Sequence, residues 1–154
     1  MSVVRTREAT PADAAGWLDL RCALWPEGSR VEHRKEIAQF FAGELAEPLA
    51  VFLAVEPGGR VVGLAELSIR AAAAGCETAG VGYLEGWFVE PTVRRQGVGR
   101  ALVAAAEEWA RARGCRDFAS DTEQGNVVSA AAHRAVGFAP VSAIAFCKAL
   151  PSPS

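Results

Sequence analysis

Apolar positions recur along the chain with two different periods, and segments of each period follow one another. A change between apolar and polar at every second position is typical of a strand that is buried on one face. We expect strands at 3–9, 49–56, 61–69, 81–90, 115–121 and 142–150. The second and third of these flank Pro57-Gly58-Gly59-Arg60, whose proline and glycines indicate a hairpin turn.

Helical spacing marks the segments between these strands. Thr10 and Pro11 have the residue types of a helix N-cap and a first helical position. We expect helices from residue 11 to about 24 and at 31–43, 98–113 and 126–136, the last two ending at glycines. The order of elements predicts one α/β (α+β) domain over 1–150, with a mixed, mostly antiparallel central sheet flanked by helices. We expect 151–154 to be a frayed tail.

The composition is that of an ordinary globular domain, and its charge limits the classes of partner. Of 154 residues, 51% are hydrophobic and 22% are charged, and the formal net charge is −2. This charge argues against nucleic-acid binding as the main activity. The sequence shows neither a signal-type apolar core near its start nor a segment long enough to cross a bilayer. We therefore expect a cytoplasmic protein with no membrane partner.

The cysteines and histidines form no recognisable metal motif. Cys22, Cys76, Cys115 and Cys147 are widely spaced and include no CxxC pair. We expect them to be free thiols in a reducing compartment. Neither histidine has a companion at ligand spacing, so no metal site is expected.

Arginines and glycines gather where the strand 81–90 gives way to the helix 98–113. The stretch 94–100 (RRQGVGR) places flexible backbone directly before the helix, where free N–H groups and the helix dipole favour an anion such as phosphate. The spacing is neither the GxGxxG of a dinucleotide-binding turn nor a P-loop. The alternative is a tight turn with solvated arginines.

This stretch resembles the pyrophosphate motif, Arg/Gln-x-x-Gly-x-Gly/Ala, of the GNAT superfamily of acetyl-CoA-dependent N-acetyltransferases. The segments LEGWFVEP and AAHRAVGF are similar to other blocks of that family. Within it, WLDLRCALWP (17–26), SIR (68–70) and GCRDFASDT (114–122) resemble the bacterial aminoglycoside 6'-N-acetyltransferases. The resemblance implies the GNAT fold with splayed central strands, and acetyl transfer from acetyl-CoA to a cationic small-molecule amine.

The resemblance also assigns cofactor-binding positions. Backbone amides of 95–100 would hold the pyrophosphate, the strand around Trp87 would pair with the pantetheine arm, and Asn126 would hydrogen-bond that arm. The Val89 N–H would face the thioester carbonyl as an oxyanion donor. The implied cofactor set is Trp87, Phe88, Val89, Arg94, Arg95, Gln96, Gly97, Val98, Gly99, Arg100 and Asn126. An alternative for Trp87 and Phe88 is that their side chains are core.

Two carboxylates are candidates for acid–base work. Glu85 lies in the apolar run YLEGWF, where a charge needs a partner or a task. Asp121 ends the strand 115–121. Because the attacking amine must lose a proton, a carboxylate can hold the ammonium and accept that proton, directly or through water. The alternatives are a salt bridge from Glu85 to an arginine such as Arg70, and a capping role for Asp121 near Thr122.

Other positions leave the substrate open. Trp25 matches a substrate-contacting tryptophan of the aminoglycoside group, or is a core residue at a helix end. His133 stands where many relatives have a tyrosine general acid, so the acid is His133 or solvent. The loop 70–80 lacks an expected aromatic residue, and Ser142 stands at about the position of an expected acid. The further acids Glu27, Glu66, Glu77 and Glu123 cannot be placed from the sequence.

Three functions are therefore compared. The first is acetylation of the 6'-amine of an aminoglycoside, the second is acetylation of another cationic or peptide amine, and the third is a non-catalytic coenzyme A sensor. A homodimer formed through the final strand, 142–150, is a further expectation from the resemblance, and an edge strand within one monomer is its alternative.

Overall fold

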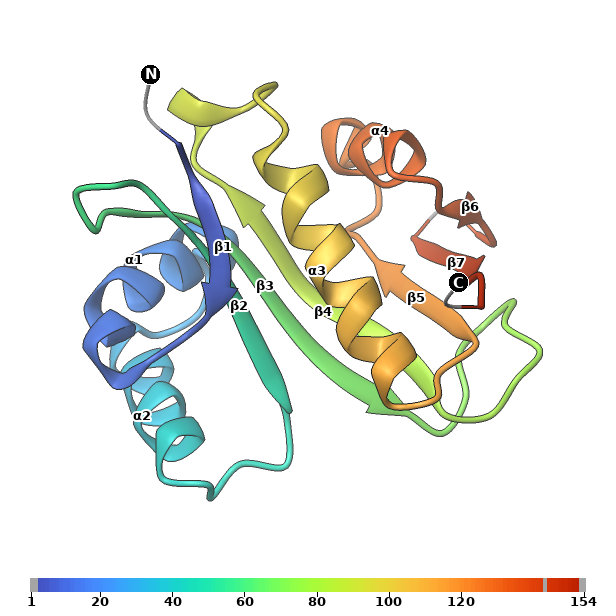
Figure 1. The fold of residues 1–154 in the computed structure, drawn as a ribbon, viewed down its shortest axis with the longest axis horizontal. Helices are drawn as coiled ribbons and strands as arrows, with labels where there is room; N and C mark the ends of the chain where they lie inside the picture. The colour runs from blue at the N-terminus through green and yellow to red at the C-terminus, as the bar shows by residue number, and fades with distance from the viewer. Residues whose placement is uncertain (1–2, 143, 153–154) are drawn as a thin grey trace.

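The computed structural model describes residues 3–142 and 144–152. The strands are β1 (Arg5–Glu8), β2 (Ala50–Val55), β3 (Val61–Arg70), β4 (Val81–Val89), β5 (Asp117–Asp121), β6 (Ala139–Pro140) and β7 (Ala145–Ala149). They form a 7-stranded sheet in the order β1-β2-β3-β4-β5-β7-β6 (Figure 1). The neighbouring strands pair antiparallel, except that β4 and β5 run parallel.

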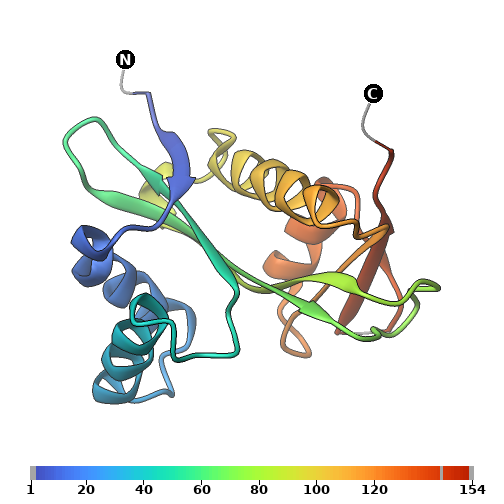
Figure 2. The ribbon, with the colours of Figure 1, turned by 60° about the horizontal axis from the view of Figure 1, so that its bottom comes forward.

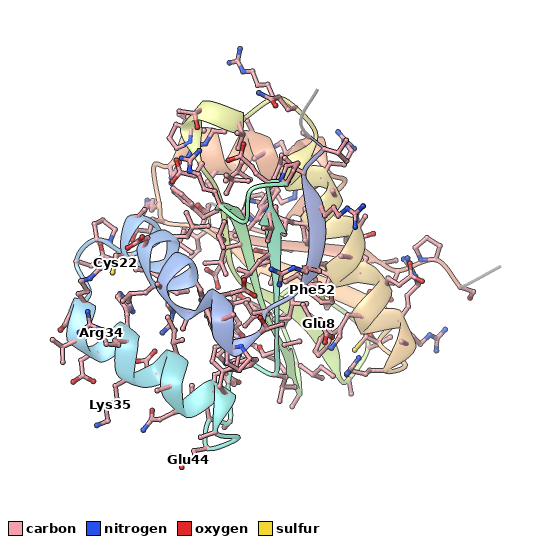
Figure 3. The ribbon with its side chains drawn as sticks, turned by 60° about the vertical axis from the view of Figure 1, so that its left-hand side comes forward. Glu8, Cys22, Arg34, Lys35, Glu44 and Phe52 are labelled. Atoms are coloured by element: carbon pink, nitrogen blue, oxygen red, sulfur yellow. A yellow bond between two sulfur atoms is a disulfide. The ribbon has the colours of Figure 1, made fainter. Side chains whose placement is uncertain are left out.

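Helices cover both faces of this sheet. They are η1 (Pro11–Asp13), α1 (Ala14–Leu24), α2 (Arg30–Phe41), η2 (Pro91–Val93), α3 (Val98–Ala112) and α4 (Val127–Ala135). Figure 2 shows α3 on one side of the sheet and α1 and α2 on the other. On α2, the exposed side chains of Arg34 and Lys35 point away from the sheet, whereas Phe52 of β2 lies on the α3 side (Figure 3).

The helix periods decide which side chains reach the core. The α3 stripe is Val98, Leu102, Val103, Ala106, Trp109 and Ala110. It packs on one face of the sheet in a large cluster that includes Leu67 and Phe118. Trp17 and Leu20 of α1 pack on the opposite face against Leu53 and Leu64. These two cores hold the middle of the sheet rigid between helices.

The parallel pair β4 and β5 is short. Its register covers only Gly82–Phe118, Tyr83–Ala119 and Leu84–Ser120. Beyond Leu84, β4 continues to Val89 and pairs only with β3, so the two strands part. A bulge lies at the same point, because Leu67 pairs with Leu84 but Glu66 pairs with Gly86. The extra residue is Glu85.

Most of the predicted elements are confirmed. The strands and helices expected from the periods are present, and Gly114 and Gly137 have the left-handed φ values, 81° and 96°, of residues that follow a helix. The expected mixed sheet, mostly antiparallel and with parted central strands, is also present. The strand β6 was not predicted, because its two residues are too few to show an alternation of apolar and polar positions. The expected tail at 151–154 lies partly outside the described residues.

The expectation of free cysteines is wrong for two of them. Cys76, in the loop between β3 and β4, forms a disulfide with Cys147 of β7, with their Cα atoms 6.0 Å apart. The two residues are 71 positions apart, so their proximity depends on the sheet order and not on local spacing. Cys22 and Cys115 are free thiols.

The final strand does not form the edge of the sheet. β7 lies between β5 and β6, so pairing of β7 across a dimer would first require β6 to move. Among the described residues, no helix is long and apolar enough to span a membrane.

Candidate active site

The stretch 94–100 forms a loop of free backbone donors at the start of α3. Arg95 and Gly97 both have left-handed φ values, 65° and 84°. Within the described chain, the N–H groups of residues 95–100 have no backbone acceptor, and the first such bond of the helix is from Ala101 to Gly97. Successive N–H groups in this conformation form an anion-binding nest, which the dipole of α3 strengthens. The loop therefore fits a pyrophosphate group.

Gly99 allows the loop to lie close to β4. A Cβ atom at Gly99 would lie 3.2 Å from Trp87 Cζ2, tighter than an ordinary contact. The indole of Trp87 packs in the core on the α3 face, and its N–H is buried without an acceptor in the described structure. The alternative considered for Trp87, a side chain packed in the core, agrees with this position, and only its main chain remains a candidate for ligand binding.

The main chain of β4 beyond Leu84 has unpaired groups on the side facing β5. Glu90 donates its N–H to the Val62 carbonyl, so the next pair, Gly63 and Val89, is the non-bonded kind whose polar groups point away from β3. The N–H of Val89 consequently faces the gap between the parted strands. Its carbonyl accepts from Arg94 Nε at 2.8 Å. An extended ligand such as a pantetheine arm could add to this edge as a strand does.

Glu85 projects from the bulge and is held by β3. Its carboxylate accepts two hydrogen bonds from Arg70, from Nε at 2.9 Å and from Nη2 at 2.7 Å, and a third from the Ser68 hydroxyl. The side chain of Glu85 is 19% exposed and that of Arg70 is 41% exposed. The salt bridge considered as the alternative for Glu85 is therefore present, and the Glu85 side chain remains partly exposed.

Asp121 is the last residue of β5, and its side chain is exposed. Its Oδ2 accepts from the Tyr83 hydroxyl at 2.5 Å. Burial, together with this bond, raises the pKa of Tyr83 well above its ordinary value. Tyr83 therefore stays protonated and acts as the donor at neutral pH.

Trp25 lies over β4 at the end of α1. A Cβ atom at Gly86 would be 2.8 Å from Trp25 Cη2, so the indole fits only against glycine. The ring is partly exposed, stacks on His33 at 6.3 Å and lies 5.3 Å from the Arg21 guanidinium. Trp25 thus packs on Gly86, the residue after Glu85, which is where a substrate contact would be expected. The same packing also agrees with a core residue at a helix end.

His133 is the buried residue of α4. Its Nδ1 lies 2.8 Å from the Ser129 carbonyl and its Nε2 lies 2.8 Å from the Ser120 hydroxyl. The ring stacks on Phe146 at 4.5 Å. These contacts assign the proton to Nδ1, and burial lowers the pKa of His133, so the ring is neutral. With its N–H bonded to a carbonyl, His133 is placed poorly as a proton donor, which favours solvent.

Two further residues have structural tasks. The side chain of Asn126 caps α4, because its Oδ1 accepts from the Ser129 N–H at 3.0 Å. Glu66 is 1% exposed and accepts from Trp17 Nε1 at 2.9 Å, with Arg21 Nε 3.0 Å away as an ion pair. Burial raises the pKa of Glu66. Glu66 therefore anchors α1 to β3 and is not a free acid for a substrate.

Sequence reasoning missed Ser68, which donates to Glu85, and Tyr83, which donates to Asp121. Both could have been found from the strand period, because residues two apart in a strand share a face. Ser68 is two residues from Arg70 on β3, and Tyr83 is two residues from Glu85 on β4. What the period could not supply is the register that sets Ser68 opposite Tyr83 and Tyr83 beside Ala119 of β5.

Known proteins share this chain's sequence and fold. The family model of the acetyltransferase (GNAT) family matches residues 15–138. The aminoglycoside N(6')-acetyltransferase type 1 of Klebsiella aerogenes is 54% identical over 142 residues, which cover 92% of each chain.

Two solved structures of aminoglycoside N-acetyltransferase AAC(6')-Iy are also similar. One, in complex with CoA, is 34% identical, with a TM-score of 0.84 over 92% of this chain and 91% of that one. The other, with the bisubstrate analogue CoA-S-monomethyl-acetylneamine, is 34% identical, with a TM-score of 0.82 over 91% and 93%. The free donors before α3 and the parted strands β4 and β5 thus occur in a chain that belongs to the acetyltransferase (GNAT) family.

Proposed function

We propose that this chain transfers the acetyl group of acetyl-CoA to the 6'-amino group of aminoglycoside antibiotics and thereby confers resistance to them. The observation that carries the proposal is the parting of β4 and β5 beside a loop of free N–H donors. Glu85 and Asp121 directly follow the last paired residues, Leu84 and Ser120, where the two strands part. The identity to the Klebsiella aerogenes enzyme supports the aminoglycoside as substrate.

Each residue has a proposed task in the transfer. Acetyl-CoA supplies the acetyl group as a thioester. The N–H groups of 95–100 hold the pyrophosphate with help from Arg94, Arg95 and Arg100, and the Val89 N–H donates to the carbonyl oxygen. Glu85 and Asp121 hold the substrate ammonium, and Glu85 accepts its proton directly or through water.

Cofactor binding is tested at Gly97. A Cβ atom there meets nothing within 4 Å, so Gly97→Val leaves the core intact but strains φ and puts a side chain into the loop. We expect acetyl-CoA binding in isothermal titration to be lost. Gly59→Val is a matched control, because Gly59 also has a positive φ, 95°, and open space, but lies in the β2–β3 hairpin. Equal affinity in the two folded variants would contradict the cradle.

The base is tested at Glu85. Glu85→Gln should lower kcat by about 10² to 10⁴-fold, the usual contribution of a general base, with little change in acetyl-CoA affinity. Arg70→Gln removes the partner of Glu85 and not its carboxylate, so it should lower kcat far less. Similar losses in the two variants would assign Glu85 to the ion pair alone.

The substrate is tested with a panel of amines in a thiol-release assay. Aminoglycosides with a 6'-amine should be acetylated, and those with a 6'-hydroxyl should not. Turnover of polyamines or lysine peptides in place of the 6'-amines would favour the second function, and coenzyme A binding without any turnover would favour a sensor.

We infer in addition that the enzyme acts in the cytoplasm and as a homodimer. Use of acetyl-CoA supports the compartment, although the Cys76–Cys147 disulfide removes the argument from free thiols. The exposed apolar side chains Val141 and Ile144, beside the edge strand β6, support self-association. Sedimentation velocity over a range of concentrations tests the dimer, and a single species of monomer mass would contradict it.

A further inference from the structure

A set of polar side chains connects the two candidate carboxylates across three strands. Arg70 from β3 and Tyr83 and Glu85 from β4 lie on one face of the sheet with Asp121 from β5. Arg70 binds Glu85 through two hydrogen bonds, and its guanidinium lies 3.6 Å above the Tyr83 ring. Tyr83 in turn donates to Asp121. The set thus runs without a break from Glu85 to Asp121.

Tyr83 differs from Asp121 in how firmly it is held. Tyr83 is 6% exposed and packs with Val81 and Ala119 in a cluster covered by the loop 71–80. Asp121 is exposed, and the Tyr83 hydroxyl is the one side-chain donor to its carboxylate among the described residues. A buried ring whose hydroxyl reaches an exposed acid can fix the orientation of that acid, because the ring itself cannot turn away.

We propose that Tyr83 is a positioning residue that holds the Asp121 carboxylate in the orientation that receives the substrate ammonium. The proposal rests on the proposed function, in which Asp121 contacts the amine. It goes beyond that function because Tyr83, a buried residue that does not touch the substrate, would raise the affinity for the substrate through Asp121. A carboxylate fixed before binding loses less freedom when the cation arrives.

Tyr83→Phe removes the hydroxyl and keeps the ring, including its contact with Arg70. We expect the KM for a 6'-amino aminoglycoside to rise about three- to tenfold, the size of effect that immobilising one side chain has on binding. We expect kcat to stay within about twofold and the KM for acetyl-CoA to be unchanged, because Glu85 and the loop 95–100 keep their contacts. A merely structural role would lower stability without this separation of KM from kcat.

The decisive measurement is a double-mutant cycle with Asp121→Asn. If Tyr83 acts through Asp121, Tyr83→Phe should raise the aminoglycoside KM in the wild-type background and change it by less than about twofold in the Asp121→Asn background. An equal increase in both backgrounds, or none in either, would overturn the proposal.

Thr78→Val is the matched control. The Thr78 hydroxyl donates to Asp117 at 2.6 Å, so this variant also removes a hydroxyl donor to a β5 aspartate, but at the start of the strand and away from Asp121. The Thr78 N–H keeps its own bond to Asp117 at 3.1 Å, so the loop 71–80 stays attached to β5. Its aminoglycoside KM should equal that of the wild type, and a rise like that of Tyr83→Phe would overturn the proposal. The cycle is run on whichever amine the wild type acetylates. Turnover of a different amine contradicts only the proposed function, and no turnover of any amine contradicts both.

Discussion

Replacing Cys76 with serine removes the disulfide that fastens the loop 71–80 to β7. The linked residues are 71 positions apart, so the disulfide restricts nearly half of the unfolded chain. In the loop-closure description, this separation corresponds to about 15 cal/mol/K of unfolded-chain entropy, or about 4 kcal/mol at 25 °C. With a urea m-value on the order of 2 kcal/mol/M, the midpoint of unfolding should fall by about 2 M.

The assay is urea unfolding with and without a phosphine reductant. The wild type in reductant should match Cys76→Ser, and Cys76→Ser should not respond to reductant. Cys22→Ser keeps the disulfide and serves as the control, with the wild-type midpoint and the wild-type response. Thiol titration of the unreduced, denatured wild type should detect Cys22 and Cys115 alone.

A wild type whose midpoint is the same in both conditions would refute this reasoning. So would a titration that finds all the cysteines as free thiols. The loop 71–80 covers Tyr83, so we also expect reduction to raise the aminoglycoside KM, which separates loss of loop order from loss of global stability.

Three further predictions concern stability and cofactor binding. The Arg7 hydrogen bonds lower the pKa of Asp13 from 3.8 to about 2, so this carboxylate stabilises the fold above pH 4 and the contribution is lost as pH falls from about 4 to 2. Urea midpoints measured over a range of acid pH should show Asp13→Asn about 1–2 kcal/mol less stable than the wild type at pH 7, allowing for screening at the exposed Arg7. The difference should shrink as pH falls through about 4 and vanish below about pH 2. Leu102 is 0% exposed, so calorimetry should find Leu102→Ala about 2–5 kcal/mol less stable, whereas alanine at Leu49, 51% exposed, should have little effect. Gly99→Val, whose branched side chain exceeds the alanine that the motif accepts, should displace Trp87 and weaken acetyl-CoA binding in titration, while Gly58→Val, with open space at its Cβ, should not.

The sequence by itself determined the elements of this protein and the loop of free N–H donors before α3. The bounds of α1 and α3 follow from signals within a few residues, such as Thr10-Pro11 before the first helix and Gly114 after the second. The free donors of 95–100 are equally local, because two positive φ values and a helix start produce them. Such features depend on neighbours along the chain, which the sequence states directly.

The tertiary structure alone decided which side chains meet. The partner of Cys76 and the partner of Tyr83 depend on the order β3-β4-β5-β7 and on register, and the burial of Glu66 depends on the packing of α1 against β3. Glu85 reaches Ser68 and Arg70 because the register places Ser68 opposite Tyr83, two residues before Glu85 on β4. A shift of one residue would turn every side chain of a strand to the other face, so contacts across strands are set by long-range packing and not by local pattern.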